Sequence, residues 1–140
     1  MTLLIDAAPL VALADPGEPQ REAILAALAS EPGALVIPAP TTAEVDYLLG
    51  RRFGAPARRA FLADLAAGRF TVASLERDDY PTILDLEAHY ADLELGLADC
   101  ALVILAARHH TTRILSFDER HLRAVTPLDG EAFILLPADA

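Results

Sequence analysis

Short apolar runs of strand length alternate with helix-length segments along the whole chain, and this alternation restricts the possible folds more than any other feature. Strands separated by helices are joined by crossover connections, which make the strands parallel and cover both faces of the sheet. The sequence therefore predicts an α/β fold with a central, mainly parallel sheet of about five strands. The predicted strands are 3–6, 34–37, 70–73, 113–116 and, at an edge, 131–136.

The segments between these runs carry apolar residues at helical spacing. Segment 98–109 is apolar on nearly every side, so we expect a buried helix there. The predicted helices are one beginning within 9–13, then 20–30, 41–52, 56–67, 76–90 and 98–109, with a turn or short helix at 118–122.

The length of 140 residues suits one compact domain spanning 1–140, and 54% hydrophobic residues favour a packed core. No apolar stretch approaches the ~18 residues of a membrane span, and the N-terminus lacks the basic region of a secretory signal. Cys100 is the only cysteine, which excludes an internal disulfide and a cysteine-rich zinc site. We therefore expect a cytoplasmic protein that is not bound to a membrane.

The formal net charge is −10, and all 11 basic residues are arginine. This charge argues against a protein that holds nucleic acid by bulk attraction. An enzyme whose acidic pocket holds cations remains open, as does a protein that binds a basic partner.

Four acids follow strands or open helices. Asp6 and Asp118 come directly after predicted strands, while Glu44 and Asp99 lie in the first turns of predicted helices. Ligand sites of open parallel sheets lie at the carboxyl ends of the strands, so we expect all four side chains to meet there. Without a cation they would repel one another. Mg²⁺ and Mn²⁺ prefer oxygen ligands, and one or two such ions would let a water attack a phosphodiester.

Each acid also has a structural interpretation. Thr41 and Glu44 have the spacing of a capping box, Asp99 would suit the dipole of its helix, and Asp118 could cap the short segment after it. Asp6 is the hardest to explain in this way, because no turn chemistry requires an acid directly after a buried strand. The four acids together favour the functional interpretation.

The histidines and the remaining arginines are less informative. We interpret His109, His110 and His121 as structural, because no pair of histidines has helical i,i+4 spacing. We expect Cys100 to be a small buried hydrophobe. Among the arginines, Arg51-Arg52 and Arg58-Arg59 form the densest basic cluster, which could contact RNA phosphates or form a solvated face.

Four segments, taken in order, resemble the successive motifs of PIN-domain proteins, and most of all the VapC-type toxins of bacterial toxin–antitoxin pairs. Each motif is weak alone, but the series is specific and covers nearly the whole chain. The matching segments are Leu4-Ile5-Asp6, Ala43 to Leu49, Gly96 to Cys100 and Ile114 to Leu122.

This resemblance implies a three-layer α/β/α domain that cuts RNA with Mg²⁺ or Mn²⁺, forms homodimers and is held inactive by a small antitoxin with a basic inhibitory segment. It implies that Asp6 and Asp99 bind the metal directly. Glu44 would act directly or through water, and Asp118 through water or a second ion. Ser116 matches a small hydroxyl residue that we expect to hydrogen-bond within the site. Arg51 and Arg52 are the candidate RNA contacts.

One departure concerns the residues after the first aspartate. The family usually has a serine or threonine nearby, whereas this chain has Ala7-Ala8-Pro9. Since such outer groups tune metal affinity, we expect weaker metal binding or some dependence on Mn²⁺.

Several other α/β functions are excluded or disfavoured. Without lysine the chain lacks a residue that receiver domains and P-loop proteins need, and Ala7-Ala8-Pro9 is not the glycine-rich turn of a dinucleotide site. Two alternatives stay open: a non-catalytic PIN-like interaction module, and a metal-dependent nuclease acting on DNA.

Overall fold

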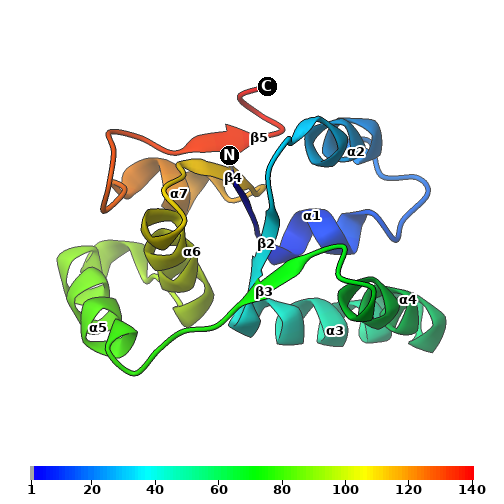
Figure 1. Cartoon of the computed structure of the whole chain (residues 1–140), viewed down its shortest axis with the longest axis horizontal. Helices are drawn as coiled ribbons and strands as arrows, with labels where there is room; N and C mark the ends of the chain where they lie inside the picture. Colours follow the sequence, from blue (N-terminus) through cyan, green and yellow to red (C-terminus); the bar gives the residue numbers. More distant parts are fainter. Residues whose placement is uncertain (1) are drawn as a thin grey trace.

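The computed structural model describes residues 2–140 and contains a five-stranded sheet (Figure 1). Every strand pairs in parallel with its neighbour, in the order β3-β2-β1-β4-β5. The predicted parallel sheet is confirmed, and the C-terminal strand lies at an edge as expected. The strands are β1 (Leu3–Ile5), β2 (Leu35–Pro38), β3 (Thr71–Ala73), β4 (Arg113–Leu115) and β5 (Ile134–Leu136).

Seven α-helices connect these strands within the described residues. They are α1 (Ala7–Ala12), α2 (Arg21–Ser30), α3 (Ala39–Phe53), α4 (Ala55–Ala66), α5 (Asp79–His89), α6 (Leu97–Arg108) and α7 (Glu119–Ala124), with a short 3-10 helix η1 (Ala91–Leu93) after α5. In residues 2–140, no helix combines the length and the apolar character needed to cross a bilayer.

The strands alternate their side chains between two separate cores. Leu4 and Val36 join residues of α5, α6 and α7 in one core, while Leu3, Ile5 and Ile37 join residues of α1, α2, α3 and α4 in the other. Figure 1 shows α5, α6 and α7 on the left of the sheet and α1, α2 and α4 on the right. The expected three-layer α/β/α arrangement is confirmed.

Helix α6 is apolar on all sides because it packs between the sheet and α5. Every residue from Cys100 to Ala106 is buried, and Cys100 has no exposed surface, as expected. A helix packed in this way has little freedom to move. It therefore holds Asp99, in its first turn, in a defined place.

Several element boundaries differ from the sequence predictions. Helix α1 begins at Ala7, before the predicted range 9–13, because Asp6 caps it directly after β1. Helix α3 begins at Ala39, two residues before the predicted start, because Pro40 suits a first helical turn. Glu44 consequently lies in the second turn, and the interpretation of Thr41 and Glu44 as a capping box is wrong. Helix α5 begins only at Asp79, whose carboxylate accepts the main-chain N–H of Glu76. Strand β5 covers only the second half of the predicted run.

The connections after β1 and β4 leave the sheet on opposite faces. The chain after β1 passes to the α1–α4 layer, whereas the chain after β4 passes to the α7 side. Because β1 and β4 are neighbours, the chain direction switches between their carboxyl ends, and this is where ligand sites of doubly wound sheets lie.

Candidate active site

Asp6 and Ser116 meet at the carboxyl ends of β1 and β4. The main-chain N–H of Asp6 donates to the carbonyl of Leu115 over 2.9 Å, which places Asp6 beside the end of β4. The buried Ser116 hydroxyl donates to Oδ2 of Asp6 over 2.7 Å and accepts the main-chain N–H of Asp118 over 3.0 Å. One hydroxyl thus holds the first and last of the four acids in register.

Asp6 also caps α1, a role that sequence reasoning did not find. Its Oδ1 accepts the main-chain N–H of Ala7 over 2.8 Å, since α1 begins immediately after β1. The expectation that no local chemistry requires this acid was wrong. Capping uses one carboxylate oxygen of Asp6, and Ser116 binds the other. Each of these oxygens keeps a lone pair with which it could bind a cation.

Asp99, Asp118 and His121 come closer together than any other metal-ligating group found in residues 2–140. One ligand atom from each lies within 4.8 Å of the others. Asp99 accepts the main-chain N–H of Gly96 over 3.3 Å, and Asp118 caps α7 by accepting the main-chain N–H of His121 over 3.1 Å. The expected capping role of Asp118 is therefore present beside its place in the cluster.

His121 belongs to this cluster, a position that sequence reasoning did not find. Its Nδ1 lies 2.7 Å from Oδ2 of Asp118 and its Nε2 lies 2.9 Å from the carbonyl oxygen of Leu93. Both partners are acceptors, and the hydrogen bond to Asp118 raises the pKa of the His121 imidazole. The i,i+3 spacing from Asp118 was the one sequence signal that could have identified it.

Glu44 completes the group from the other layer. It is exposed on α3, and its pKa is raised first by partial burial and then by the charges of Asp6 and Asp99. Burial is also the main reason why the pKa values of Asp6 and Asp99 are raised. The charge of Asp118 raises both further. The four predicted acids therefore act on one another electrostatically.

This donor set fits a divalent cation. Carboxylate oxygens are the ligands that Mg²⁺ and Mn²⁺ prefer, and an imidazole nitrogen is acceptable to Mn²⁺ and softer ions. Burial is the first cause of the raised pKa values of Asp6, Glu44 and Asp99, and repulsion from neighbouring acids adds to it. A bound cation would relieve that repulsion. His121 engages both ring nitrogens in hydrogen bonds, so it would have to release Asp118 or Leu93 before binding an ion itself.

The structure separates the two arginines that sequence reasoning had grouped. Arg51 donates to the phenol oxygen of Tyr47 over 2.9 Å on the exposed face of α3. Arg52 instead lines a cavity of about 450 Å³ together with Glu44 and Phe117. Only Arg52 therefore borders the acid site.

Comparisons with known proteins agree with this geometry. Residues 3–126 match the PIN domain family. The chain is 35% identical over 135 residues to Ribonuclease VapC26 of Mycobacterium tuberculosis (strain ATCC 25618 / H37Rv), a match that covers 96% of this chain and 100% of the relative.

The fold is also similar to a solved structure. The crystal structure of Mycobacterium tuberculosis VapC20, described as a sarcin-ricin loop cleaving toxin, superposes with a TM-score of 0.76 and 19% sequence identity. The match covers 84% of this chain and 91% of that one. At this identity the likeness concerns the fold. Together with the family match and the 35% identical relative, it shows that the chain belongs to the PIN domain family and, within it, to the VapC-type ribonuclease toxins.

Proposed function

We propose that this protein is a metal-dependent endoribonuclease that hydrolyses RNA phosphodiesters at Asp6, Glu44, Asp99 and Asp118. The observation that carries the proposal is the electrostatic state of these acids. Three of them have raised pKa values, partly through one another's charges. Such perturbed groups in a crevice at the carboxyl edge of a sheet are typical of functional sites.

Asp6, Glu44, Asp99 and Asp118 would hold one or two Mg²⁺ or Mn²⁺ ions. When bound, the cation polarises the phosphodiester and makes the attacking water more acidic. Glu44, which is exposed and has a raised pKa, is suited to accept the proton of that water.

Neighbouring side chains position these acids. Ser116 orients Asp6 through its hydroxyl. His121 is held by the carbonyl of Leu93 and orients Asp118 through its other ring nitrogen. Arg52 borders the acid site and can neutralise an RNA phosphate as it approaches, because guanidinium matches phosphate in geometry. These groups would act through the acids or the substrate backbone.

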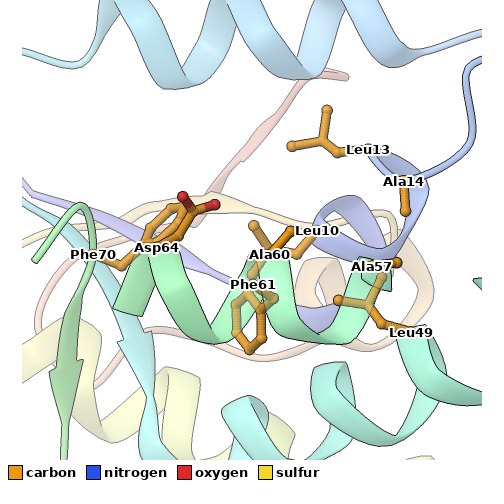
Figure 2. A pocket seen from close by; sticks show the side chains of 9 residues that line it. All are labelled: Leu10, Leu13, Ala14, Leu49, Ala57, Ala60, Phe61, Asp64 and Phe70. Carbon is orange, nitrogen blue, oxygen red and sulfur yellow. The ribbon is translucent and has the colours of Figure 1, made fainter. Parts of the chain in front are cut away.

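We also propose a basic antitoxin as the inhibitor. Figure 2 shows an apolar cavity of about 350 Å³, to which Leu10 of α1, Leu49 of α3 and Phe61 of α4 contribute. The opposite side of α1 borders the cavity that contains Glu44 and Arg52. An apolar segment in the first cavity would therefore bring a following arginine to the acids, where its guanidinium would take the place of a metal cation.

Co-expression with the small protein encoded next to this gene tests the partner. A stable complex that inhibits cleavage is expected, and an Ala60→Glu variant, at an exposed position that lines the apolar cavity, should weaken it without changing cleavage. Failure to form any complex would count against an antitoxin. Size measurement of the free protein tests the expected homodimer.

The direct test of activity is cleavage of a labelled RNA pool that includes transfer and ribosomal RNA, with Mg²⁺, Mn²⁺ or chelator. Asp6→Asn and Asp99→Asn are the variants of choice. Asparagine preserves the cap that Asp6 provides to α1, whereas alanine would destabilise it by about 1 kcal/mol. Metal-dependent cleavage that both variants lose is the expected result.

Two other results would point to the alternatives. Cleavage of single-stranded DNA but not RNA would favour a DNA nuclease. No cleavage of either polymer, or cleavage that survives both substitutions, would contradict the four-acid mechanism and favour an interaction module.

A further inference from the structure

The cavity beside the acid site has a composition that phosphate chemistry alone does not explain. It measures about 450 Å³, a size typical of small-ligand pockets. Glu44 is one of its lining residues, and so is Phe117, the residue before Asp118, so the cavity adjoins the acid site. Its walls combine apolar residues of α1 and α3 with two aromatic rings and a charged rim.

We propose that this cavity is a nucleobase subsite that receives a base next to the scissile phosphate and favours guanine. The proposal rests on the proposed function, because it assumes that the substrate is RNA. Base–aromatic stacking is the common way in which proteins hold an unpaired RNA base. Phe53 and Phe117 supply the rings, and Arg52 lies beside them to meet the phosphate of the same nucleotide.

The rim determines which base fits. Asp15 and Glu18 line the cavity, and each uses one oxygen to accept a main-chain N–H, from Gly17 over 2.9 Å and from Gln20 over 3.2 Å respectively. These bonds hold the carboxylates in place. The second oxygen of each stays free to accept, and the bonded oxygen keeps a further lone pair. An ionised carboxylate offers acceptors only.

Guanine is the base that satisfies such a rim best. Its N1–H and N2 amino group are two adjacent donors that match the two oxygens of a carboxylate. Uracil has a single N–H between two carbonyl oxygens, which an acidic rim repels. The phosphate, in contrast, would be repelled by the rim, so the nucleotide can enter in one orientation only.

The cavity of Figure 2 provides the internal comparison. It lies on the other side of α1, its lining contains Phe61 and Phe70, and its one acid, Asp64, is paired with Arg69 over 2.8 Å. None of the four site acids lines it. An aromatic residue in that cavity is therefore a matched control for one in the proposed subsite.

The test is binding of uncharged nucleosides to the metal-free protein, followed by NMR chemical shifts, so that neither cleavage nor metal is required. Guanosine should shift the signals of residues around Arg52 and Phe53, and inosine, which lacks the N2 amino group, should bind about tenfold more weakly. Uridine should bind most weakly. Equal shifts with all three nucleosides, or shifts confined to the cavity of Figure 2, would overturn the proposal.

Substitutions assign the binding to the named residues. Phe53→Leu should weaken guanosine binding at least about fivefold through lost stacking, and it should fold because Phe53 is 39% exposed. Phe70→Leu should leave binding unchanged. Asp15→Asn with Glu18→Gln keeps both main-chain hydrogen bonds but should remove the preference for guanosine over uridine.

The two proposals fail separately. Metal-dependent RNA cleavage without guanosine binding would refute the subsite and leave the nuclease intact. In another outcome, the Phe53→Leu variant binds guanosine as well as the wild type does but binds the antitoxin more weakly. This result would assign the cavity to the protein partner and refute the base subsite.

Discussion

Glu31 and Asp6 lie near opposite edges of the same parallel sheet, and their carboxylates have opposite surroundings. At the amino edge, the fully buried Glu31 side chain accepts the main-chain N–H of Gly33 over 3.1 Å and the Nε of Arg113 over 3.2 Å. At the carboxyl edge, Asp6 receives only neutral donors, from Ala7 and Ser116, and faces the charge of Asp118.

A second carboxylate follows the pattern of Glu31. Asp79, at the start of α5, accepts the main-chain N–H of Glu76 and the guanidinium of Arg108. These bonds, the first above all, lower the pKa of Asp79. Glu31 and Asp79 thus have arginine partners within the chain, whereas no arginine of residues 2–140 forms an ion pair with Asp6, Glu44 or Asp99. This difference supports the proposal that the carboxyl edge binds a cation from outside.

The largest expected effect comes from supplying that cation. At a concentration of Mn²⁺ 100 times its dissociation constant, the free energy of unfolding should rise by about 2.7 kcal/mol. Chemical denaturation with and without metal measures it. Asp99→Asn should lose most of this gain, and Asp79→Asn should keep it. A gain of equal size in Asp99→Asn would show that the metal binds elsewhere.

Removing the fold-serving carboxylate should have the next largest effect. Asp79→Asn keeps the shape of the side chain but removes the charge that binds Arg108, so the free energy of unfolding should fall by about 2 kcal/mol. Cleavage per folded molecule should not change. A loss of cleavage in a variant that remains folded would contradict the separation between the two kinds of acid.

Ser116→Ala should lower the cleavage rate roughly tenfold, which is the lower end of what outer partners of a metal site contribute. The hydroxyl holds Asp6 and the main chain of Asp118 together, so Mn²⁺ affinity measured by titration should fall in parallel. Thr41→Val is the control, since the buried Thr41 hydroxyl has no hydrogen-bond partner among the described residues. Equal losses in both variants would indicate a general packing effect.

The smallest effect is a difference in pH dependence between two variants of the metal-free protein. The pKa of Asp99 is raised in the folded protein. The contribution of Asp99 to the free energy of unfolding is therefore favourable at low pH and is lost as the pH rises through that pKa. Asp99→Asn should therefore be more stable than the wild type near pH 7, and this gain should shrink toward about pH 4.

Asp79 should behave in the opposite way. Its folded pKa is lowered, so its contribution is present above the ordinary carboxyl pKa and is lost only as the pH falls through the folded value. The Asp79→Asn variant should thus remain less stable than the wild type at about pH 4. Denaturation curves at both pH values measure the two variants together, and parallel pH profiles would contradict the comparison.

Much of the fold could be predicted from the sequence, and so could the meeting of the four acids near one edge of the sheet, because local rules determine both. Apolar periodicity distinguishes strands from helices, and a parallel sheet brings the residues after its strands to one edge. Asp6 and Asp118 were placed by these rules alone. The start of α3 was missed because a proline in the first turn extends the helix backward past Thr41.

Tertiary structure decided which other side chains join those acids. The contact between Ser116 and Asp6 spans 110 residues, and that between His121 and Leu93 spans 28. Periodicity does not encode such contacts, which depend on strand order and on how α6 and α7 pack. Arg51 and Arg52 show both levels. Arg51 donates to Tyr47 four residues before it on the same helix, a contact that helical spacing itself allows. Arg52 points about 100° away, and the packing of α1 against α3 forms the cavity that it shares with Glu44.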